Sequence, residues 1–408
     1  MKTEQRPPVL LFYASRQIGG GEAYFINLGL EAIKAGRRCV VVDYAGGYVI
    51  NRIPGAEHVE YSDDAGADYL NDCEAFIPLG AIVFLGSKLR ISLTSKVLFV
   101  SIHHNHSIEL GNWAWLLRGM RPRTAGRIWP YLEPIRFRSV RNFLEGISHR
   151  RGLVYCAPFQ RDFDESYLGL PLQAAVVPIP VPRRQFGDPM VVPKGKAIVW
   201  VSRLAKEKAE ILYEIIRELE ASQSRRKLIV IGDGPFKQTI SERAVQAGIE
   251  IETPGIISGF ELDEYLRLHA ELCIGVGTAA VEMAMAGFPT LVARLPGYCE
   301  GPFIWFFQTS AGDTIVTPKT NKSAVGISAA LRQLQGPDDW AHTARISQEA
   351  AFTRHAPEAS WEQLDEALAS NRLTVSEATS LGRMNEQPYR IIRSIKVWLR
   401  RMISESRR

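Results

Sequence analysis

Short apolar runs alternate with amphipathic segments along most of this 408-residue chain. The first run spans 8–13 and precedes three glycines at 19–21; apolar residues then recur at helical spacing up to Gly36, where we predict that a helix ends. A second apolar run follows at 39–44. Runs without polar positions are typical of strands that are covered on both faces, so this strand-helix-strand unit predicts a parallel sheet.

The alternation is less regular between about 70 and 150, although 82–86 and 97–103 still have the pattern of strands. A proline- and charge-rich stretch, 178–196, follows, and we place a domain boundary there. Strands and helices then alternate cleanly again, with strands expected at 197–202, 227–232, 271–275 and 290–294. Repeated strand-helix units predict a second doubly wound α/β domain.

We therefore predict an N-terminal Rossmann-like domain at 1–185, a C-terminal one at 192–368 and a helical tail at 369–408. The composition, 46% hydrophobic and 23% charged, is ordinary for a globular protein. The five cysteines include no CxxC pair, which argues against a disulfide framework or a zinc ribbon and favours a reducing compartment. Neither a signal peptide nor an apolar run of the ~18 residues needed to span a membrane is visible, so a cytoplasmic location is expected.

Ligands of doubly wound domains bind beyond the carboxyl ends of the strands, where loops lead into helices. At the first such junction, Gly20 and Gly21 would let the backbone approach an anionic ligand closely. The dinucleotide fingerprint is broken, because Tyr24 stands where its third glycine belongs, and we disfavour a nicotinamide cofactor even though Asp43 stands at a suitable distance. A flexible turn is the alternative interpretation.

Arg203 and Lys208 follow the strand expected at 197–202. Arginine can fork onto phosphate oxygens and lysine can act as a point charge, which is the neutralisation that a departing diphosphate needs. The alternative is a solvated basic helix start, which the helix dipole disfavours. Gly232 and Asp233, in a turn after the next strand, are a weaker signal that is more often structural.

Gly277 and Thr278 open a helix at another strand end, which again makes an anion site. Glu282 follows about one turn later, in a helix that is otherwise apolar. A lone acid in such a helix needs a partner or contact with solvent. A ribose diol is one such partner, and a plain surface acid is the alternative.

Three segments together resemble the donor domain of GT-B glycosyltransferases of the large GT4 type. These are SRLAKEK at 202–208, LIVIGDGP at 228–235 and VEMAMAGFPTLVA at 281–293, and their order and spacing both fit. In the N-terminal half, GGGE at 19–22 resembles the GGxE segment of the same family. The resemblance implies two Rossmann-like domains that face each other across a cleft, and a UDP- or GDP-sugar as the donor substrate.

The resemblance also implies roles for the candidate residues. Arg203 and Lys208 would hold the donor diphosphate, and Glu282 would bind the ribose. Backbone amides at Gly277 and Thr278 would contact phosphate, while Gly20 and Gly21 would let the N-terminal domain close onto the donor. The turn at Gly232 and Asp233 would belong to the same substrate-binding set.

The chain departs from the family at one position. The family usually has two glutamates eight positions apart, and the first of them contacts the transferred sugar; here Ile274 stands in its place. The sugar and the retention of anomeric configuration therefore stay open. His103 best matches a histidine that the family places at a strand end, and it could bind substrate together with His104 or act as a general base in an inverting enzyme.

We expect no metal ion. The histidines of HHNH at 103–106 are too close in sequence for a standard zinc pattern. No DxD-like pair stands at a strand end of the donor domain, since Asp338 and Asp339 lie in a Gly-Pro loop elsewhere. A metal-independent mechanism, with the charge neutralised by Arg203 and Lys208, is consistent with both observations.

Two basic stretches favour a membrane surface. Residues 111–141 hold seven arginines against one acid, interleaved with aromatic residues that include Trp129, Tyr131 and Phe137. Residues 387–408 form a basic amphipathic helical pattern. The alternatives are nucleic-acid binding or packing within its own domain for the first stretch, and a closing helix across the N-terminal domain for the second.

The sequence thus predicts a metal-independent glycosyltransferase with no cofactor beyond its donor substrate. It would move a sugar from a nucleotide-sugar to a lipid-linked glycan acceptor at the inner membrane face, in surface polysaccharide or glycolipid biosynthesis. No nucleic-acid partner is expected. A UDP-sugar epimerase of GT-B fold, or a catalytically silent GT-B protein that binds a nucleotide-sugar or a partner enzyme, is the alternative.

Overall fold

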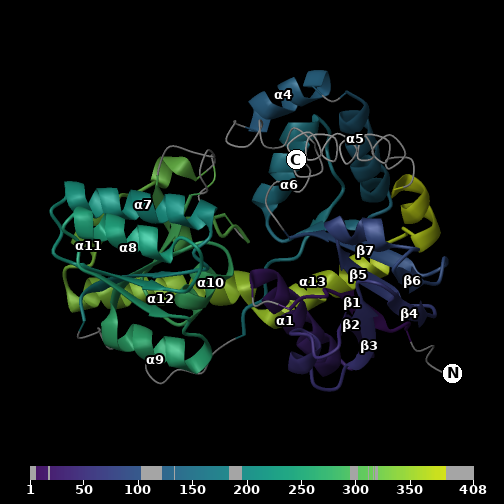
Figure 1. Ribbon diagram of the computed structural model, residues 1–408, viewed down its shortest axis with the longest axis horizontal. Helices are drawn as coiled ribbons and strands as arrows, with labels where there is room; N and C mark the ends of the chain where they lie inside the picture. The colour runs from purple at the N-terminus through teal and green to yellow at the C-terminus, as the bar shows by residue number, and fades with distance from the viewer. Residues whose placement is uncertain are drawn as a thin grey trace, which may run out of the picture. The chain divides into compact units, whose positions relative to one another are not determined.

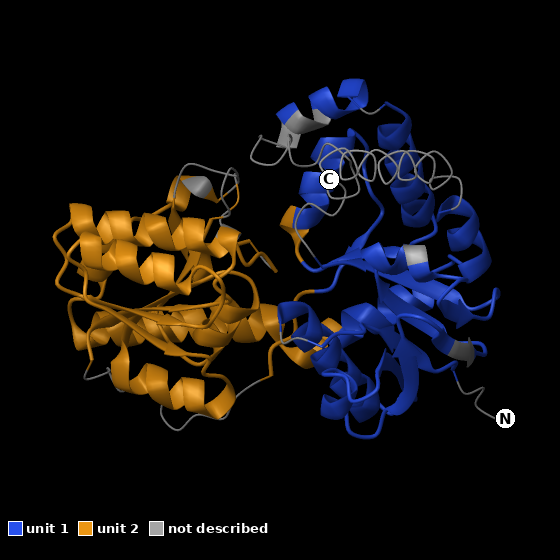
Figure 2. Ribbon diagram, viewed as in Figure 1, with its two compact units in different colours: residues 1–156, 160–177, 361–408 blue, residues 157–159, 178–360 orange. Residues whose placement is uncertain are grey.

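The computed structural model forms two compact units (Figure 2). It describes residues 6–16, 19–102, 122–132, 134–182, 195–294, 302–310, 312–315, 317 and 320–382. Unit 1 takes the described residues within 1–156, 160–177 and 361–408, and unit 2 takes those within 157–159 and 178–360. The chain thus passes into unit 2 briefly at 157–159 and again at Pro178, and it returns to unit 1 at Trp361.

Unit 1 is built on a nine-stranded sheet in the order β6-β4-β3-β2-β1-β5-β7-β8-β9, with helices on both of its faces (Figure 1). Its strands are β1 (Val9–Phe12), β2 (Cys39–Tyr44), β3 (Glu57–Ser62), β4 (Gly66–Leu70), β5 (Glu74–Pro78), β6 (Leu89–Ile91), β7 (Lys96–Ser101), β8 (Leu153–Tyr155) and β9 (Ala175–Val176). Its helices are α1 (Gly20–Lys34), α4 (Pro122–Leu132), α5 (Pro134–His149), α6 (Pro158–Leu168) and α13 (Pro357–Ser370), the last two beginning in unit 2. All strand pairs are parallel except β3 with β4.

The apolar runs of unit 1 form its central strands. Every residue of β1 is buried, as expected for a parallel strand that is covered on both faces. The expectation of a strand at 82–86 is wrong, because the chain instead forms a short 3₁₀ helix, Leu79–Phe84. An apolar run this short fits a buried helical turn as well as a strand, and Gly86, at a φ of +77°, turns the chain directly after it.

Unit 2 contains a six-stranded sheet in the order β12-β11-β10-β13-β14-β15, parallel except for β14 with β15. The strands are β10 (Ala197–Val201), β11 (Lys227–Ile231), β12 (Ile251–Gly255), β13 (Ala270–Gly275), β14 (Thr290–Ala293) and β15 (Phe303–Trp305). The helices are α7 (Lys206–Ala221), α8 (Lys237–Gln246), α9 (Gly259–His269), α10 (Thr278–Met285), α11 (Ile327–Gln333) and α12 (Pro337–His355). Asp338 and Asp339 lie in the first turn of α12, which corrects their expected place in a loop.

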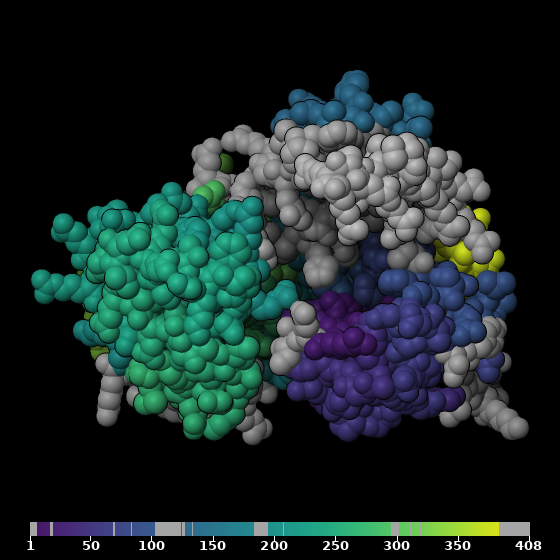
Figure 3. Space-filling view, in the orientation of Figure 1, coloured from purple at the N-terminus to yellow at the C-terminus, as the bar shows by residue number. Residues whose placement is uncertain are grey.

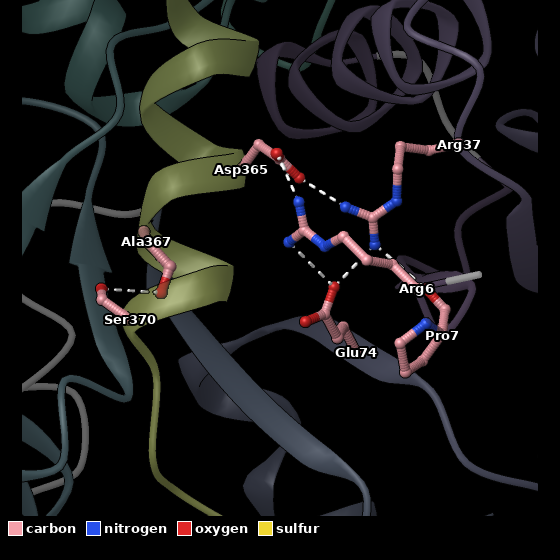
Figure 4. A network of polar contacts seen from close by, with 7 residues as sticks. All are labelled: Arg6, Pro7, Arg37, Glu74, Asp365, Ala367 and Ser370. Carbon is pink, nitrogen blue, oxygen red and sulfur yellow. Dashed lines mark hydrogen bonds and ion pairs between the residues drawn. The ribbon is translucent and has the colours of Figure 1, made fainter. Parts of the chain in front are cut away.

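The end of the described chain is fastened to unit 1 by ion pairs (Figure 4). Asp365 of α13 accepts hydrogen bonds from Arg6 at 2.7 Å and from Arg37 at 2.5 Å, and Arg37 also pairs with Glu74 at 2.6 Å. Arg37 and Glu74 are largely buried, with 11% and 6% of their side chains exposed. This network holds α13 against the start of β5 and the α1–β2 loop.

Residues 371–382 continue along unit 1. The side-chain amide of Asn371 donates to the Val97 carbonyl, and the Val97 N–H donates to the Leu373 carbonyl, both at 2.9 Å. The predicted second domain extended to 368, whereas the second compact unit ends at Ser360. The basic amphipathic pattern at 387–408 lies outside the described residues.

Candidate functional site

The strand order places the candidate residues of unit 2 together. From β12 to β10 the chain order of neighbouring strands decreases, and from β13 to β14 it increases. The direction of winding therefore reverses between β10 and β13. Connections leave such a switch point toward opposite faces of the sheet, which opens room for a ligand at the carboxyl ends of the strands. The segments that follow the three central strands β10, β11 and β13 carry Arg203, Lys208, Gly232, Asp233, Gly277, Thr278 and Glu282.

The loop after β10 is held rigidly at its start. Buried Trp200 donates its indole N–H to the Ser202 hydroxyl at 3.1 Å, and that hydroxyl donates to the Arg203 carbonyl at 2.8 Å. The Arg203 side chain is exposed and forms no hydrogen bond or ion pair within the described part of the chain. Lys208 lies one turn further on, in the first turn of α7. The fold thus fixes the backbone of Arg203 and leaves its guanidinium available to an anion.

Gly232 is needed because two loops touch at this position. A Cβ on Gly232 would lie 1.9 Å from the Ser202 carbonyl oxygen, and one on Gly234 would lie 2.7 Å from the Leu204 oxygen. The Leu204 N–H also donates to the Asp233 carbonyl at 2.9 Å. The Asp233 carboxylate accepts from the Gly234 N–H at 2.9 Å. The turn after β11 therefore supports the loop that carries Arg203.

The start of α10 depends on glycine for a different reason. Gly277 has φ +62° and ψ −141°, a conformation that is essentially restricted to glycine. Its N–H donates to the Thr314 carbonyl at 3.0 Å, which corrects the expectation that this amide faces phosphate. The N–H groups of Thr278 and the next residue begin the helix, whose dipole favours an anion there. Glu282, partly exposed, lies about one turn further along α10.

Ile274 is fully buried and lies inside the sheet. It is the penultimate residue of β13, beside Trp200 of β10 and Leu291 of β14. The position at which the family has its first glutamate is therefore a core position in this chain. The apolar residue agrees with its surroundings, because a carboxylate there would be buried among hydrophobic strands.

In unit 1, the glycine loop leads into α1 after β1. Gly21 is packed so closely that a Cβ would lie 2.2 Å from the Tyr13 hydroxyl, whereas Gly20 is exposed. The Ser15 hydroxyl, which lies before the helix, donates to the carboxylate of Glu22 in the first turn of α1 at 2.6 Å. The sequence does not predict the Ser15–Glu22 pair, because only the folded path of the chain brings the two side chains together.

Asp43 is a structural residue. Its carboxylate is fully buried and accepts hydrogen bonds from the backbone N–H groups of Ser15, Tyr44, Val49 and Ile50, at 2.8 to 3.2 Å. All of this hydrogen-bonding capacity is directed to the loops after β1 and β2. Asp43 is therefore not placed to bind a ribose, in agreement with the broken dinucleotide fingerprint.

The remaining candidate residues lie outside the part of the chain that the structure describes. His103 and His104 are outside the described residues, as are residues 111–121 of the arginine- and aromatic-rich stretch. Within the described ranges, no three His, Cys, Asp or Glu side chains are grouped so that they could hold a metal ion. Over the same ranges, no helix has the length and apolar character needed to cross a membrane.

A hollow of about 610 Å³ lies at the opposite edge of the unit 2 sheet. It is bordered by Lys196, before β10, and by Arg226, before β11, and its wall includes an ion pair between Arg226 and Glu271. These residues are at the amino ends of the strands, whereas the candidate residues follow the carboxyl ends. The hollow is therefore separate from the candidate site.

Comparisons with solved structures show the same fold in several glycosyltransferases. HepE of Anabaena, in complex with UDP and glucose, is 14% identical with a TM-score of 0.56, over 90% of this chain and 100% of that one. A variant of S. aureus TarM, in complex with fondaparinux, α-GlcNAc-glycerol and UDP, is 10% identical with a TM-score of 0.57, over 89% and 99%. WaaB, a lipopolysaccharide outer core galactosyltransferase, is 13% identical with a TM-score of 0.52, over 89% and 99%.

No family model and no curated protein sequence matches the chain. The structural likeness nevertheless extends over about nine tenths of the chain and over both units. At 10–15% identity it shows the fold and not the activity. The two parallel-sheet α/β domains of this chain therefore have the GT-B fold, as the sequence motifs predicted.

Proposed function

We propose that this protein transfers a sugar from a nucleotide-sugar donor to a membrane-associated, lipid-linked glycan acceptor, without a metal ion. The observation that carries the proposal is the gathering of three separate motifs at one edge of the unit 2 sheet, on both sides of its switch point. HepE and TarM, which share the fold, were both solved with UDP. UDP-sugars are therefore the first donors to test, followed by GDP-sugars.

The proposed reaction exchanges one bond at the anomeric carbon. An acceptor hydroxyl oxygen bonds to that carbon, the bond from the carbon to the diphosphate oxygen breaks, and the hydroxyl proton passes to the departing diphosphate or to water. Negative charge grows on the departing diphosphate, and Arg203 and Lys208 would stabilise it together with the N–H groups at the start of α10. Glu282 would orient the nucleotide through its ribose.

A lipid-linked acceptor is supported by charge. Residues 111–141 carry seven arginines against one acid, and such clusters are attracted to anionic lipid headgroups. WaaB, which shares the fold, acts on lipopolysaccharide, itself a lipid-linked glycan. We propose that the acceptor is presented at the inner face of a membrane, as in surface polysaccharide or glycolipid synthesis.

The test is nucleotide release from a panel of UDP- and GDP-sugars, with membrane lipid extract as acceptor and EDTA present. Arg203→Gln and Glu282→Gln should each lower kcat/KM by about 100-fold, since each removes a charged contact to the donor. Arg332→Gln is the matched control, because Arg332 is an exposed cation beside the hollow at the opposite edge of the sheet.

Each outcome separates the proposal from its alternatives. Turnover that needs lipid, survives EDTA and is lost in both variants supports it. Nucleotide binding without turnover on any donor would instead support a catalytically silent binding protein. A protein that binds no nucleotide at all, with the variants behaving like wild type, would exclude both functions.

A further inference from the structure

Three large apolar side chains are exposed where α4 ends and α5 begins. Tyr131, Leu132 and Ile135 have 87%, 43% and 65% of their surfaces exposed, within five residues of chain. We call these three residues the helical tip. Single exposed apolar residues are common, but such a cluster on a folded surface marks an interaction site. Figure 3 shows the side chains of α4 at the surface of the molecule.

The tip is rigid because the same stretch also supplies buried aromatic residues. Trp129 is fully buried, and its ring lies 5.2 Å from that of Phe137 and 5.1 Å from that of Tyr167, between ring centroids. These contacts join α4, α5 and α6. The structure therefore divides the arginine- and aromatic-rich stretch in two. Trp129 anchors the helices, and Tyr131 with its neighbours faces solvent on a fixed support.

Exposed arginines border the tip on both helices. Arg127 precedes Tyr131 by four residues on α4, and Arg138 follows Ile135 by three on α5, so each arginine shares a helix face with an apolar residue of the tip. Both are exposed and form no hydrogen bond or ion pair with the described residues. Over 122–149 the sequence has five arginines against two acids. The tip is thus an apolar surface within a positive one.

We propose that the helical tip inserts into the surface of a bilayer that contains anionic phospholipids. Leu132 and Ile135 would enter the acyl boundary, and Tyr131 suits the headgroup level because its ring is apolar and its hydroxyl is polar. Arg127 and Arg138 would bind lipid phosphates while their methylene stems follow the apolar surface. Leu132 and Ile135 favour lipid over nucleic acid, because Tyr131 is the one ring of the tip on which a base could stack and the two aliphatic side chains beside it offer none.

This inference rests on the proposed function in one respect: a lipid-linked acceptor requires the enzyme to reach a membrane surface. It adds the element that makes the contact and the class of lipid that it selects. Membrane binding is measurable without donor or acceptor, so it can be tested separately from glycosyl transfer.

The first experiment is sedimentation of the full-length protein with vesicles. Vesicles of phosphatidylglycerol and phosphatidylcholine in equal parts should bind the protein, and pure phosphatidylcholine vesicles should bind it far more weakly. Tyr131→Ser with Ile135→Ser should lower the partition coefficient by at least about tenfold. Arg127→Gln and Arg138→Gln should each lower it by about fivefold, on the anionic vesicles only.

The matched control removes exposed apolar side chains from another place. Val245 on α8 and Leu268 on α9 are 68% and 61% exposed and lie in unit 2. The double variant Val245→Ser with Leu268→Ser should bind anionic vesicles like wild type. Wild-type protein that does not sediment with anionic vesicles, or tip variants that bind as well as this control, would overturn the proposal.

A second measurement detects insertion directly. A polarity-sensitive fluorophore on Tyr131→Cys should shift to the blue and brighten with anionic vesicles, and the same probe on Val245→Cys should not. Labelling is selective in a Cys299→Ser background, because the other four cysteines are buried. Burial raises the pKa of both Cys39 and Cys156 to about 12, which suppresses their reactivity.

An unshifted probe at position 131 would also overturn the proposal, even if the protein sediments through another segment. If vesicles bind as expected but no donor is turned over, the proposed function is wrong and membrane insertion of the helical tip is still supported. If transfer to extracted lipid proceeds while vesicles do not bind the protein, only the proposal that the helical tip inserts into a bilayer is wrong.

Discussion

Replacing Gly232 by alanine tests whether Arg203 must be held where the fold places it. The added Cβ would lie 1.9 Å from the Ser202 carbonyl oxygen, and ordinary contacts begin at 3.4 Å, so this backbone must move by about 1.5 Å. The φ of +139° adds strain for any other residue. Together these effects should lower the free energy of unfolding by about 2–4 kcal/mol.

The displaced backbone leads directly into Arg203. A shift of about 1 Å at a group that positions substrate can reduce activity about 100-fold, so we expect a loss of that size in kcat/KM for nucleotide release. Gly248→Ala is the matched control. Gly248 also has a positive φ, +71°, but no atom lies within 4 Å of its added Cβ. It should lose about 1 kcal/mol of stability and keep full activity.

Urea unfolding and steady-state kinetics on both variants separate the two effects. A Gly232→Ala protein that is folded at the assay temperature and keeps kcat/KM within about threefold of the control would refute the link between this turn and activity, because a displaced Arg203 should cost far more. In that case either the loop has relaxed without cost or Arg203 does not contact the donor. The Arg203→Gln variant then decides between these two explanations.

Three further predictions concern stability. Burial lowers the pKa of His355 to about 4; since the unfolded chain takes up this proton near pH 6.5, unfolding free energy should fall by about 3 kcal/mol as pH drops from 6.5 to 4 and level off below. Thermal melts of His355→Asn should show a smaller slope over this range, and an unchanged slope would exclude His355 as the cause. Asp365→Asn, which weakens the contacts to Arg6 and Arg37, should cost about 1–2 kcal/mol in urea unfolding, less at 1 M salt, and no loss would mean that the network does not fasten α13. Ile274→Glu should lower stability by at least about 3 kcal/mol without raising activity, and a stable variant would contradict the burial of this position.

The sequence by itself determined the alternation of strands and helices around the candidate residues, and the location of the motifs. The runs at 39–42 and 197–201 are apolar at every position, and such runs are typical of parallel strands that are covered on both faces. Arg203 and Glu282 could be singled out because each breaks a local pattern: a cation just before a helix start, and an acid in an apolar helix. These signals lie within a few residues of chain.

The tertiary structure alone decided which residues the folded chain needs for packing and which side chains it leaves exposed. Gly232 meets Ser202 from thirty positions earlier, and the amide of Gly277 is taken by Thr314. Trp129 is buried and Tyr131 is exposed, although both belong to one aromatic, basic stretch. Each outcome depends on contacts between residues far apart in sequence, and local periodicity carries no information about such contacts. The closely packed space between the helices holds the Trp129 ring and not that of Tyr131, and only the fold determines which of the two is buried.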